Sequence, residues 1–504
     1  PVAEGTDEVN HLRILRSDGG MEALGYHGFS CAAGHTCTDT RFETAEEAID
    51  EGFGDEIPFK DLTFETGVNL KTALHYLNGE ESEDKKITAN VSTVTFGLNK
   101  DYKNITSKYN PTFIGSEQDV AVYSYYVKND AGKYDIYVLA DSKIYTPKDS
   151  TGLFQGMALL TTVDTTNMDV SRTVNMKAMF MSCESLTSLD VSKWNVSNVE
   201  AMNMTFTYCS SLKELNVSGW NVGKVTTMSS MFYDCSSLES LNVTNWNVEN
   251  VTNMQMLFYN CQKLKNINLS NWQVGNVTTM KHMFWHCEAI ESLDVGGWNV
   301  SKVATFERMF SSCHSIKSLD LNNWKTTSAT NMAYMFYDCK TMHTLNVSNF
   351  DLSDVTTIHG MFEKCYVLKE LDVKAWDVSR VEDMIVTFRE CDALKILDLS
   401  AWNTSNVKAT TEMFQGDANL QTIYVGDGWD ISHVEDQYID TEDELSTRLM
   451  FEGCTSLKGS NNTTLIRDGE GNAIVDKTYA RVDNAPEAPG YLTYKQYVPE
   501  TPEA

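Results

Sequence analysis

The chain has 504 residues, of which 42% are hydrophobic, and its formal net charge is −30. The hydrophobic fraction is sufficient for a packed core, whereas the acidic excess argues against nucleic acid and anionic membranes as partners, because both require a basic surface. The sequence contains no uninterrupted apolar run of about 18 residues, so we expect no membrane-spanning segment.

Residues 1–86 are expected to form a small α+β region of unknown role. The stretch "ETAEEAIDEGF", with Thr44 as N-cap, and the stretch "GVNLKTALHYLNG" are typical of short helices. Cys31 and Cys37 flank "AAGHT", and in an extracellular protein two such cysteines form a disulfide. Two alternatives remain: the cysteines could bind zinc together with His35, or they could be free thiols.

Residues 87–150 are expected to form a β-rich N-terminal cap. The stretch "ITANVSTVTFGL" is typical of a strand, and "VAVYSYYVKNDAGKYDIYVLA" predicts a hairpin with its turn at "NDAGK". Because a stack of repeats leaves its first unit uncovered, we expect this segment to cover the first coil.

Residues 151–457 repeat with a period of 26 residues. Phenylalanine recurs at each step from Phe154 to Phe414, and tryptophan occupies another column from Trp194 to Trp402, with Phe350 as a single replacement. One unit has the approximate pattern C-x-S-L-x-x-L-[DN]-V-S-x-W-N-V-x-x-V-x-x-M-x-x-[MT]-F-x-x. This period is typical of a solenoid, in which each coil buries its apolar face against the next one.

Each coil has two expected elements. The part "LxxLxV" alternates as a short parallel strand does, and the part "VxxMxx[MT]F" has the apolar spacing of a helical or 3₁₀ turn. We therefore predict an α/β solenoid of the leucine-rich-repeat type with about 11–12 coils. Residues 458–504 then form a C-terminal cap and tail.

Nine cysteines stand in one column of the repeat. Equivalent positions of successive coils lie about 4.8 Å apart with parallel side chains, which is poor geometry for a disulfide and does not converge on a zinc ion. Cysteine is also among the residues most often buried. The column is therefore interpreted as a packed structural ladder of thiols: Cys183, Cys209, Cys235, Cys261, Cys287, Cys313, Cys339, Cys365 and Cys391.

The repeat "MFxxCxSLxxLDVSxWNVSNVxxM" resembles that of the BspA-like leucine-rich-repeat surface proteins of bacteria, in the branch with a 26-residue repeat. The resemblance extends from about residue 87 to about residue 494. It implies secretion, a cell-surface or extracellular location, and binding to proteins or surfaces in place of catalysis. Residues 1–85 lie outside it.

A polar column follows the middle of the predicted strands and should face outward. Its side chains could form a hydrogen-bonded ladder between coils or a partner-binding face. The adjacent pairs Asp294/Asp320 and Asp372/Asp398 could also bind Ca²⁺ through their carboxylates. The column consists of Asp190, Asn216, Asn242, Asn268, Asp294, Asp320, Asn346, Asp372 and Asp398.

The residue after the repeated phenylalanine is aromatic in several coils. Tyr233, Tyr259, Trp285 and Tyr337 are expected to form a stacked, exposed column that grips a peptide or a glycan ring, or merely covers the turn. His282 and His286 are four residues apart, a spacing that chelates a metal on a helical turn, but the repeat offers no third ligand nearby.

The sequence contains no phosphate-binding loop, no nucleophile elbow and no HExxH motif. We therefore expect a non-enzymatic surface protein that mediates adhesion to a host or bacterial surface protein or to a glycan. We expect no cofactor other than the Ca²⁺ considered above. The alternative is a structural subunit that self-assembles into a fibre or surface layer.

Overall fold

The fold is that of a computed structural model, which describes residues 12–16, 21–24, 62–65, 68–115, 118–434, 449–469, 472–484 and 486–498. The chain divides into two compact units, Pro1–Val199 and Glu200–Ala504. The predicted disulfide between Cys31 and Cys37 and the predicted helix that begins near Thr44 lie outside the described residues. The predicted domain boundaries at residues 86, 150 and 457 remain predictions.

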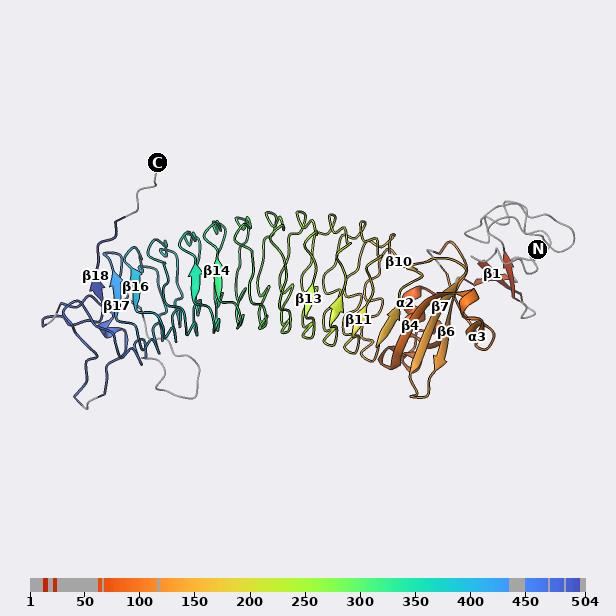
Figure 1. The fold of residues 1–504 in the computed structure, drawn as a ribbon, viewed down its shortest axis with the longest axis horizontal. Helices are drawn as coiled ribbons and strands as arrows, with labels where there is room; N and C mark the ends of the chain where they lie inside the picture. Colours follow the sequence, from red (N-terminus) through yellow and green to blue (C-terminus); the bar gives the residue numbers. More distant parts are fainter. Residues whose placement is uncertain are drawn as a thin grey trace. The chain divides into compact units, whose positions relative to one another are not determined.

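The first unit contains a mixed five-stranded sheet of order β5-β6-β7-β4-β9. Strands β6 and β7 form the predicted antiparallel hairpin, and β4 lies parallel to both β7 and β9. Since β9 belongs to the first repeats, its pairing with β4 joins the cap to them through backbone hydrogen bonds (Figure 1). The strands are β4 (Val91–Leu98), β5 (Thr112–Ile114), β6 (Val122–Lys128), β7 (Tyr134–Ala140) and β9 (Thr162–Asp164).

The remaining elements of this unit are short. The predicted helix near residue 70 is confirmed as α2, in which Asn69 accepts a hydrogen bond from the Thr72 backbone N–H and so acts as the N-cap. The other elements are β1 (Leu12–Arg16), β2 (Met21–Leu24), β3 (Leu62–Glu65), α2 (Leu70–His75), η3 (Leu77–Gly79), η4 (Glu83–Lys85), η5 (Thr88–Asn90), η6 (Asn99–Asp101), α3 (Lys103–Thr106), β8 (Ile144–Tyr145), β10 (Met168–Asp169) and β11 (Ser188–Leu189).

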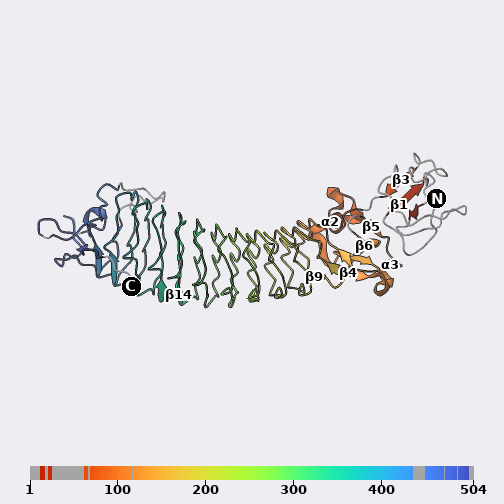
Figure 2. The same ribbon diagram turned by 90° about the horizontal axis from the view of Figure 1, so that it is seen from above.

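The second unit is a repeat fold in which successive coils stand side by side (Figures 1 and 2). Parallel bridges connect residues 26 positions apart in an unbroken series from Ala201–Thr227 to Asp383–Ala409. The strands within the coils are brief and form small separate sheets. They are β12 (Glu214–Leu215), β13 (Ser240–Leu241), β14 (Ser318–Asp320), β15 (Thr344–Asn346), β16 (Ile396–Leu399) and β17 (Thr422–Val425), followed by η8 (Lys477–Tyr479) and β18 (Thr493–Tyr494).

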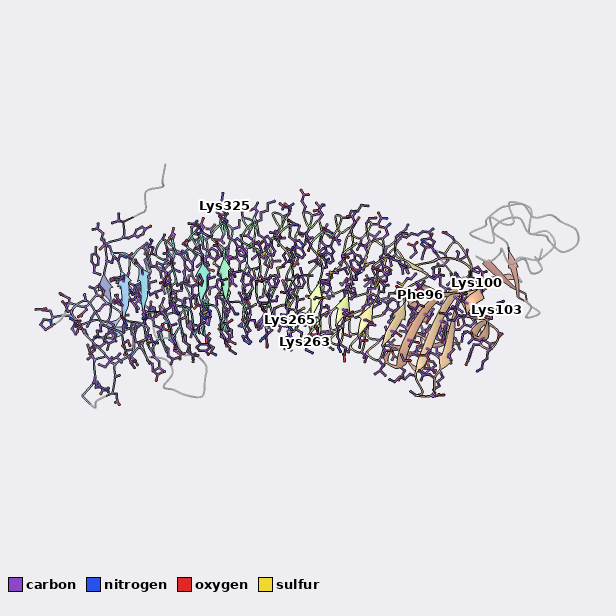
Figure 3. All side chains as sticks on the ribbon, viewed as in Figure 1. Phe96, Lys100, Lys103, Lys263, Lys265 and Lys325 are labelled. Carbon is purple, nitrogen blue, oxygen red and sulfur yellow. The ribbon has the colours of Figure 1, made fainter. Side chains whose placement is uncertain are left out.

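The core of the second unit consists of stacked columns of identical side chains. Phe232 and Phe258 stack with ring centroids 5.7 Å apart, and Trp246 and Trp272 stack at 6.3 Å. The indole N–H of Trp246 donates to the carbonyl of Val217 in the preceding coil at 3.1 Å, so this buried donor has a hydrogen-bond partner. Each buried ring contributes roughly 1.5–3 kcal/mol, and the columns therefore supply most of the driving force for stacking. Charged side chains such as Lys263, Lys265 and Lys325 point outward at the edges (Figure 3).

The predicted helical return in each coil is wrong, since no helix is present between residues 118 and 434, all of which are described. Two positions per coil, two residues before and two residues after the repeated phenylalanine, adopt left-handed backbone conformations. Around Phe232 these are Ser230, with φ 55°, and Asp234, with φ 57°. Two left-handed residues four positions apart are incompatible with an α-helix over this segment.

The backbone of this segment instead forms a chain of turns. The Tyr233 N–H donates to the carbonyl of Ser230 within its own coil, whereas the Phe232 N–H donates to Leu257 in the next coil at 3.0 Å. Each left-handed residue costs on the order of 1 kcal/mol, and the hydrogen bonds between coils offset this cost. Such turns space apolar residues three to four positions apart, as a helix does, so the sequence pattern does not distinguish the two.

None of the helices among the described residues is long and apolar enough to cross a membrane.

Candidate binding surface

The aromatic column predicted from the sequence forms a continuous surface in the second unit. The rings of Tyr233 and Tyr259 stack in parallel with centroids 4.3 Å apart, and Trp285 meets Tyr259 edge-on at 5.0 Å. Tyr208, which is 39% exposed, extends the row by an edge-on contact of 5.3 Å with Tyr233. All four predicted members, Tyr337 included, are half-buried, whereas the sequence had predicted an exposed column.

A second column, not recognised in the sequence, contributes to the same surface. Arg308 and Tyr334 occupy the left-handed position two residues before the phenylalanine. The Arg308 guanidinium lies 4.9 Å from the Trp285 ring centroid and 4.0 Å from that of Tyr334, and Tyr334 contacts Tyr337 edge-on at 5.6 Å. We call this surface the aromatic strip; it consists of Tyr208, Tyr233, Tyr259, Trp285, Arg308, Tyr334 and Tyr337.

The two columns lie side by side because a turn connects their residues within each coil. The Tyr337 backbone N–H donates to the carbonyl of Tyr334 at 3.1 Å, which closes a turn and brings the first and last side chains together. Trp285 and His282 are related in the same way, with ring centroids 4.8 Å apart. A pattern of i and i+3 aromatic or cationic residues around the phenylalanine is the signal that could have revealed the second column.

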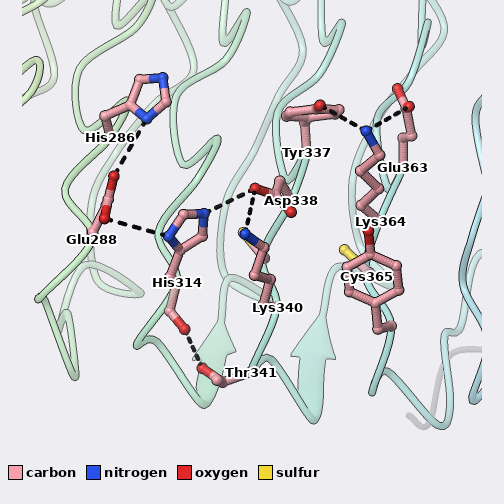
Figure 4. A network of polar contacts seen from close by, with 12 residues as sticks. His286, Glu288, His314, Tyr337, Asp338, Lys340, Thr341, Glu363, Lys364 and Cys365 are labelled. Atoms are coloured by element: carbon pink, nitrogen blue, oxygen red, sulfur yellow. Dashed lines mark hydrogen bonds and ion pairs between the residues drawn. The ribbon is translucent and has the colours of Figure 1, made fainter.

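A network of polar contacts borders the aromatic strip (Figure 4). Glu288 lies between His286 and His314, with contacts of 3.8 and 3.6 Å, and the Nε2 atom of His314 is 2.9 Å from Asp338. Asp338 also contacts Lys340 at 3.3 Å. These residues come from successive coils, so their contacts connect neighbouring repeats in addition to the backbone ladder.

A second part of the network lies beside Tyr337. The Lys364 ammonium donates to the Tyr337 hydroxyl at 3.1 Å and lies 3.9 Å from Glu363 (Figure 4). The hydrogen bond with Tyr337 raises the pKa of Lys364 above its usual value, although burial acts in the opposite direction. The ammonium therefore remains charged at this end of the strip.

His282 and His286 do not share a helical turn, because both have left-handed φ values of 59° and 58°. His282 instead contacts Glu307 at 3.2 Å, and burial lowers the pKa of both imidazoles. Among the described residues, no group of three or more His, Cys, Asp or Glu side chains is arranged to hold a metal ion.

The repeats match a known protein family. Residues 148–265, 237–345 and 330–462 match the family described as "Mycoplasma protein of unknown function, DUF285", and together these ranges cover more than half of the chain. The chain belongs to the DUF285 family. No curated protein matches it.

The DUF285 chain is also similar to a solved structure described as "Crystal structure of TLR13-ssRNA13 complex". The match has 17% sequence identity and a TM-score of 0.19, and it covers 64% of this chain and 55% of the other. The DUF285 chain therefore spans about half the length of that protein.

The polar column of the DUF285 coils does not form the expected ladder between coils. In eight of its nine members the side chain accepts a hydrogen bond from the backbone N–H two residues later, as Asn268 does from Ser270 at 3.1 Å. This local turn satisfies the side chain without a neighbour. Seven of the nine side chains are exposed, and the candidate face therefore remains accessible. The exposed members are Asp190, Asn216, Asn242, Asn268, Asp294, Asp320 and Asp372, whereas Asn346 and Asp398 are half-buried.

One carboxylate of the pairs considered for Ca²⁺ already has a cationic partner. Asp398 pairs with Lys495 from the C-terminal segment. Burial alone would raise the pKa of Asp398, but the hydrogen bonds from Lys495 and Ser400 hold it below its usual value. At this position the lysine, and not Ca²⁺, compensates the charge of the carboxylate.

The cysteine ladder is confirmed as packing. All nine cysteines are buried and none of them forms a disulfide, and Cys454 is buried in the same way. From Cys235 onward each thiol donates to the carbonyl of a phenylalanine in the preceding coil, for example Cys261 to Phe232 at 3.2 Å. Burial raises the pKa of Cys365 to about 12, which keeps this thiol protonated and unreactive.

Proposed function

We propose that the chain is a non-enzymatic bacterial surface protein that binds other proteins through the aromatic strip. The proposed architecture is a solenoid of the leucine-rich-repeat type, related to the BspA-like surface proteins that the sequence resembles. The DUF285 repeats support membership in a repeat family, and the turns described above replace the helices of an α/β coil.

The composition of the aromatic strip carries this proposal. Tyrosine, tryptophan and arginine are the residues most enriched at binding hot spots, because they provide large contact areas with few rotatable bonds. In the aromatic strip these side chains are half-exposed and fixed by ring contacts of 4.3–5.6 Å. The side chains of the aromatic strip would therefore lose little conformational entropy when a partner binds.

The repeat geometry favours binding over catalysis. The polar groups of the second unit form lines along successive coils, whereas catalysis requires groups that converge on a reacting atom. An extracellular location is compatible with the thiols, because complete burial protects them from oxidants. The resemblance to secreted surface repeats supports this location.

The proposal can be tested with the full chain on an array of purified extracellular and cell-surface proteins and of glycans. We expect the triple substitution Tyr233→Ser, Tyr259→Ser and Trp285→Ser to abolish the binding that the wild type shows. The matched control replaces Asn216, Asn242 and Asn268 by Ser on the polar column and should bind normally. If only the polar-column variant loses binding, or if the array shows no protein bound, the proposal is wrong.

A further inference from the structure

The side chain of Arg308 occupies an unusual position in the centre of the aromatic strip. Its guanidinium lies between two rings, 4.9 Å from the centroid of Trp285 and 4.0 Å from that of Tyr334, and the residue is half-buried. Two cation–π contacts therefore restrain the planar guanidinium between the rings.

The backbone N–H of Arg308 donates to the carbonyl of Ala333 at 2.9 Å, but its guanidinium forms no hydrogen bond or ion pair with any residue in the part of the chain that the structure describes. The adjacent carboxylate of Glu307 is occupied by other groups: Lys281 at 2.9 Å, His282 at 3.2 Å and Asn331 at 3.2 Å. Burial alone would raise the pKa of Glu307, but the contacts with Lys281 and His282 hold it below its usual value. Glu307 is therefore compensated by Lys281 and His282, and not by Arg308.

Two other arginines of the second unit pair with carboxylates. Arg380 contacts Asp354 at 2.6 Å, and Arg389 contacts Glu412 at 2.7 Å. The Arg308 guanidinium has no such carboxylate partner among the described residues, although the chain has a net charge of −30. Its planar fork of donors is matched in geometry to a carboxylate, which it can bind through two parallel hydrogen bonds.

We propose that Arg308 is the point at which the aromatic strip binds a single carboxylate side chain of a partner polypeptide. This inference rests on the proposed function, because it assumes that the aromatic strip is the contact surface. The acidic balance of the chain repels a strongly acidic partner, so the carboxylate belongs to a segment that is otherwise uncharged or basic.

The ring contacts favour a polypeptide over a glycan. A sugar ring stacks on an open aromatic face. In the aromatic strip, Tyr233 and Tyr259 cover each other, and Arg308 covers Tyr334. Trp285 is contacted by Arg308 and by the ring of His286, which stacks on it at 5.3 Å. The rings therefore offer edges and side-chain donors, which suit the irregular surface of a peptide.

The test uses peptides selected from a random 12-residue display library by panning against the immobilised full chain. We expect the selected peptides to share one Asp or Glu among neutral or apolar residues. Arg308→Gln should weaken their binding by at least about tenfold, and Arg308→Lys, which keeps the charge but not the fork, should weaken it less. Arg380→Gln removes the same charge from an exposed site and should leave binding unchanged.

A double-mutant cycle identifies the contact. Replacing the shared peptide Glu by Gln should cause a similar loss with the wild type but little further loss with Arg308→Gln. The inference is overturned if the two losses add, if the peptides lack a carboxylate, if no peptide binds, or if only glycans bind in an Arg308-dependent way. Peptides that bind through the tyrosines but ignore Arg308 would refute this inference alone, whereas peptides insensitive to the Tyr233, Tyr259 and Trp285 triple substitution would refute the proposed function.

Discussion

Asp417 occupies the next position of the cysteine column, 26 residues after Cys391, and it provides a test of how a buried carboxyl in this column affects stability. The side chain is fully buried. One oxygen, Oδ1, accepts a hydrogen bond from the Cys391 backbone N–H at 2.8 Å, while Oδ2 has no partner among the described residues. We predict that Asp417→Cys, which restores the column, stabilises the protein.

The expected gain depends on pH. Burial raises the pKa of Asp417 well above its usual value; the Cys391 N–H opposes this shift, and the nearby Asp392 and Glu390 add to it. A carboxyl whose pKa is raised by folding contributes full stability only below its unfolded pKa, near 4, and this contribution is lost as the pH rises toward the folded pKa. The wild type should therefore lose about 1.4 kcal/mol per pH unit in this window relative to a variant that lacks the carboxyl.

The magnitude at low pH follows from the hydrogen bonds. Removing a buried polar oxygen without a partner gains about 1–3 kcal/mol, and losing the bond with Cys391 costs about 1 kcal/mol. At pH 4 the variant should therefore be more stable by about 0–2 kcal/mol. The difference should widen at pH 5 and pH 6 because the wild type alone must either ionise the buried group or hold it protonated.

The assay is urea unfolding at pH 4, 5, 6 and 7, followed by tryptophan fluorescence, with the free-energy difference between variant and wild type compared at each pH. Asp372→Cys is the matched control, since Asp372 is exposed on the polar column and its substitution should change stability by about 0.5 kcal/mol or less. A difference for Asp417→Cys that stays constant between pH 4 and pH 7, or a destabilised variant, would refute the reasoning.

Three further predictions concern the coils. Phe258→Ala should lower the free energy of unfolding by about 3–5 kcal/mol because it opens a cavity between two stacked rings, whereas Tyr259→Ser should lower it by about 1 kcal/mol. Similar melting temperatures for the two variants would contradict the placement of Phe258 in the core and of Tyr259 on the surface. The nine ladder thiols should resist alkylation until the protein is unfolded, and mass spectrometry that finds several rapidly modified sites would contradict their burial. Deleting residues 236–261 should yield a folded protein by circular dichroism because it removes one period, but deleting residues 236–248 should not; equal stability of the two would be incompatible with stacked coils.

The sequence by itself determined the features that every coil repeats. The period of 26 residues, the inward columns of Phe258 and Trp272, and the packing role of Cys261 all follow from residue type and spacing. The hairpin of β6 and β7 was equally accessible, because a turn between two alternating strands is a local signal. These predictions succeeded because one local pattern, repeated many times, leaves little ambiguity about which side chains face inward.

The tertiary structure alone decided the path of the backbone between these columns. Residues such as His282, Arg308 and Tyr334 have no intrinsic preference for a left-handed conformation, and hydrogen bonds to the coil about 25 residues later stabilise it. The resulting turns, and not a helix, bring Arg308 between Trp285 and Tyr334 and leave Asn268 bonded to its own backbone. Contacts between coils select this conformation, and for that reason the composition of the aromatic strip could not be read from the spacing within a single repeat.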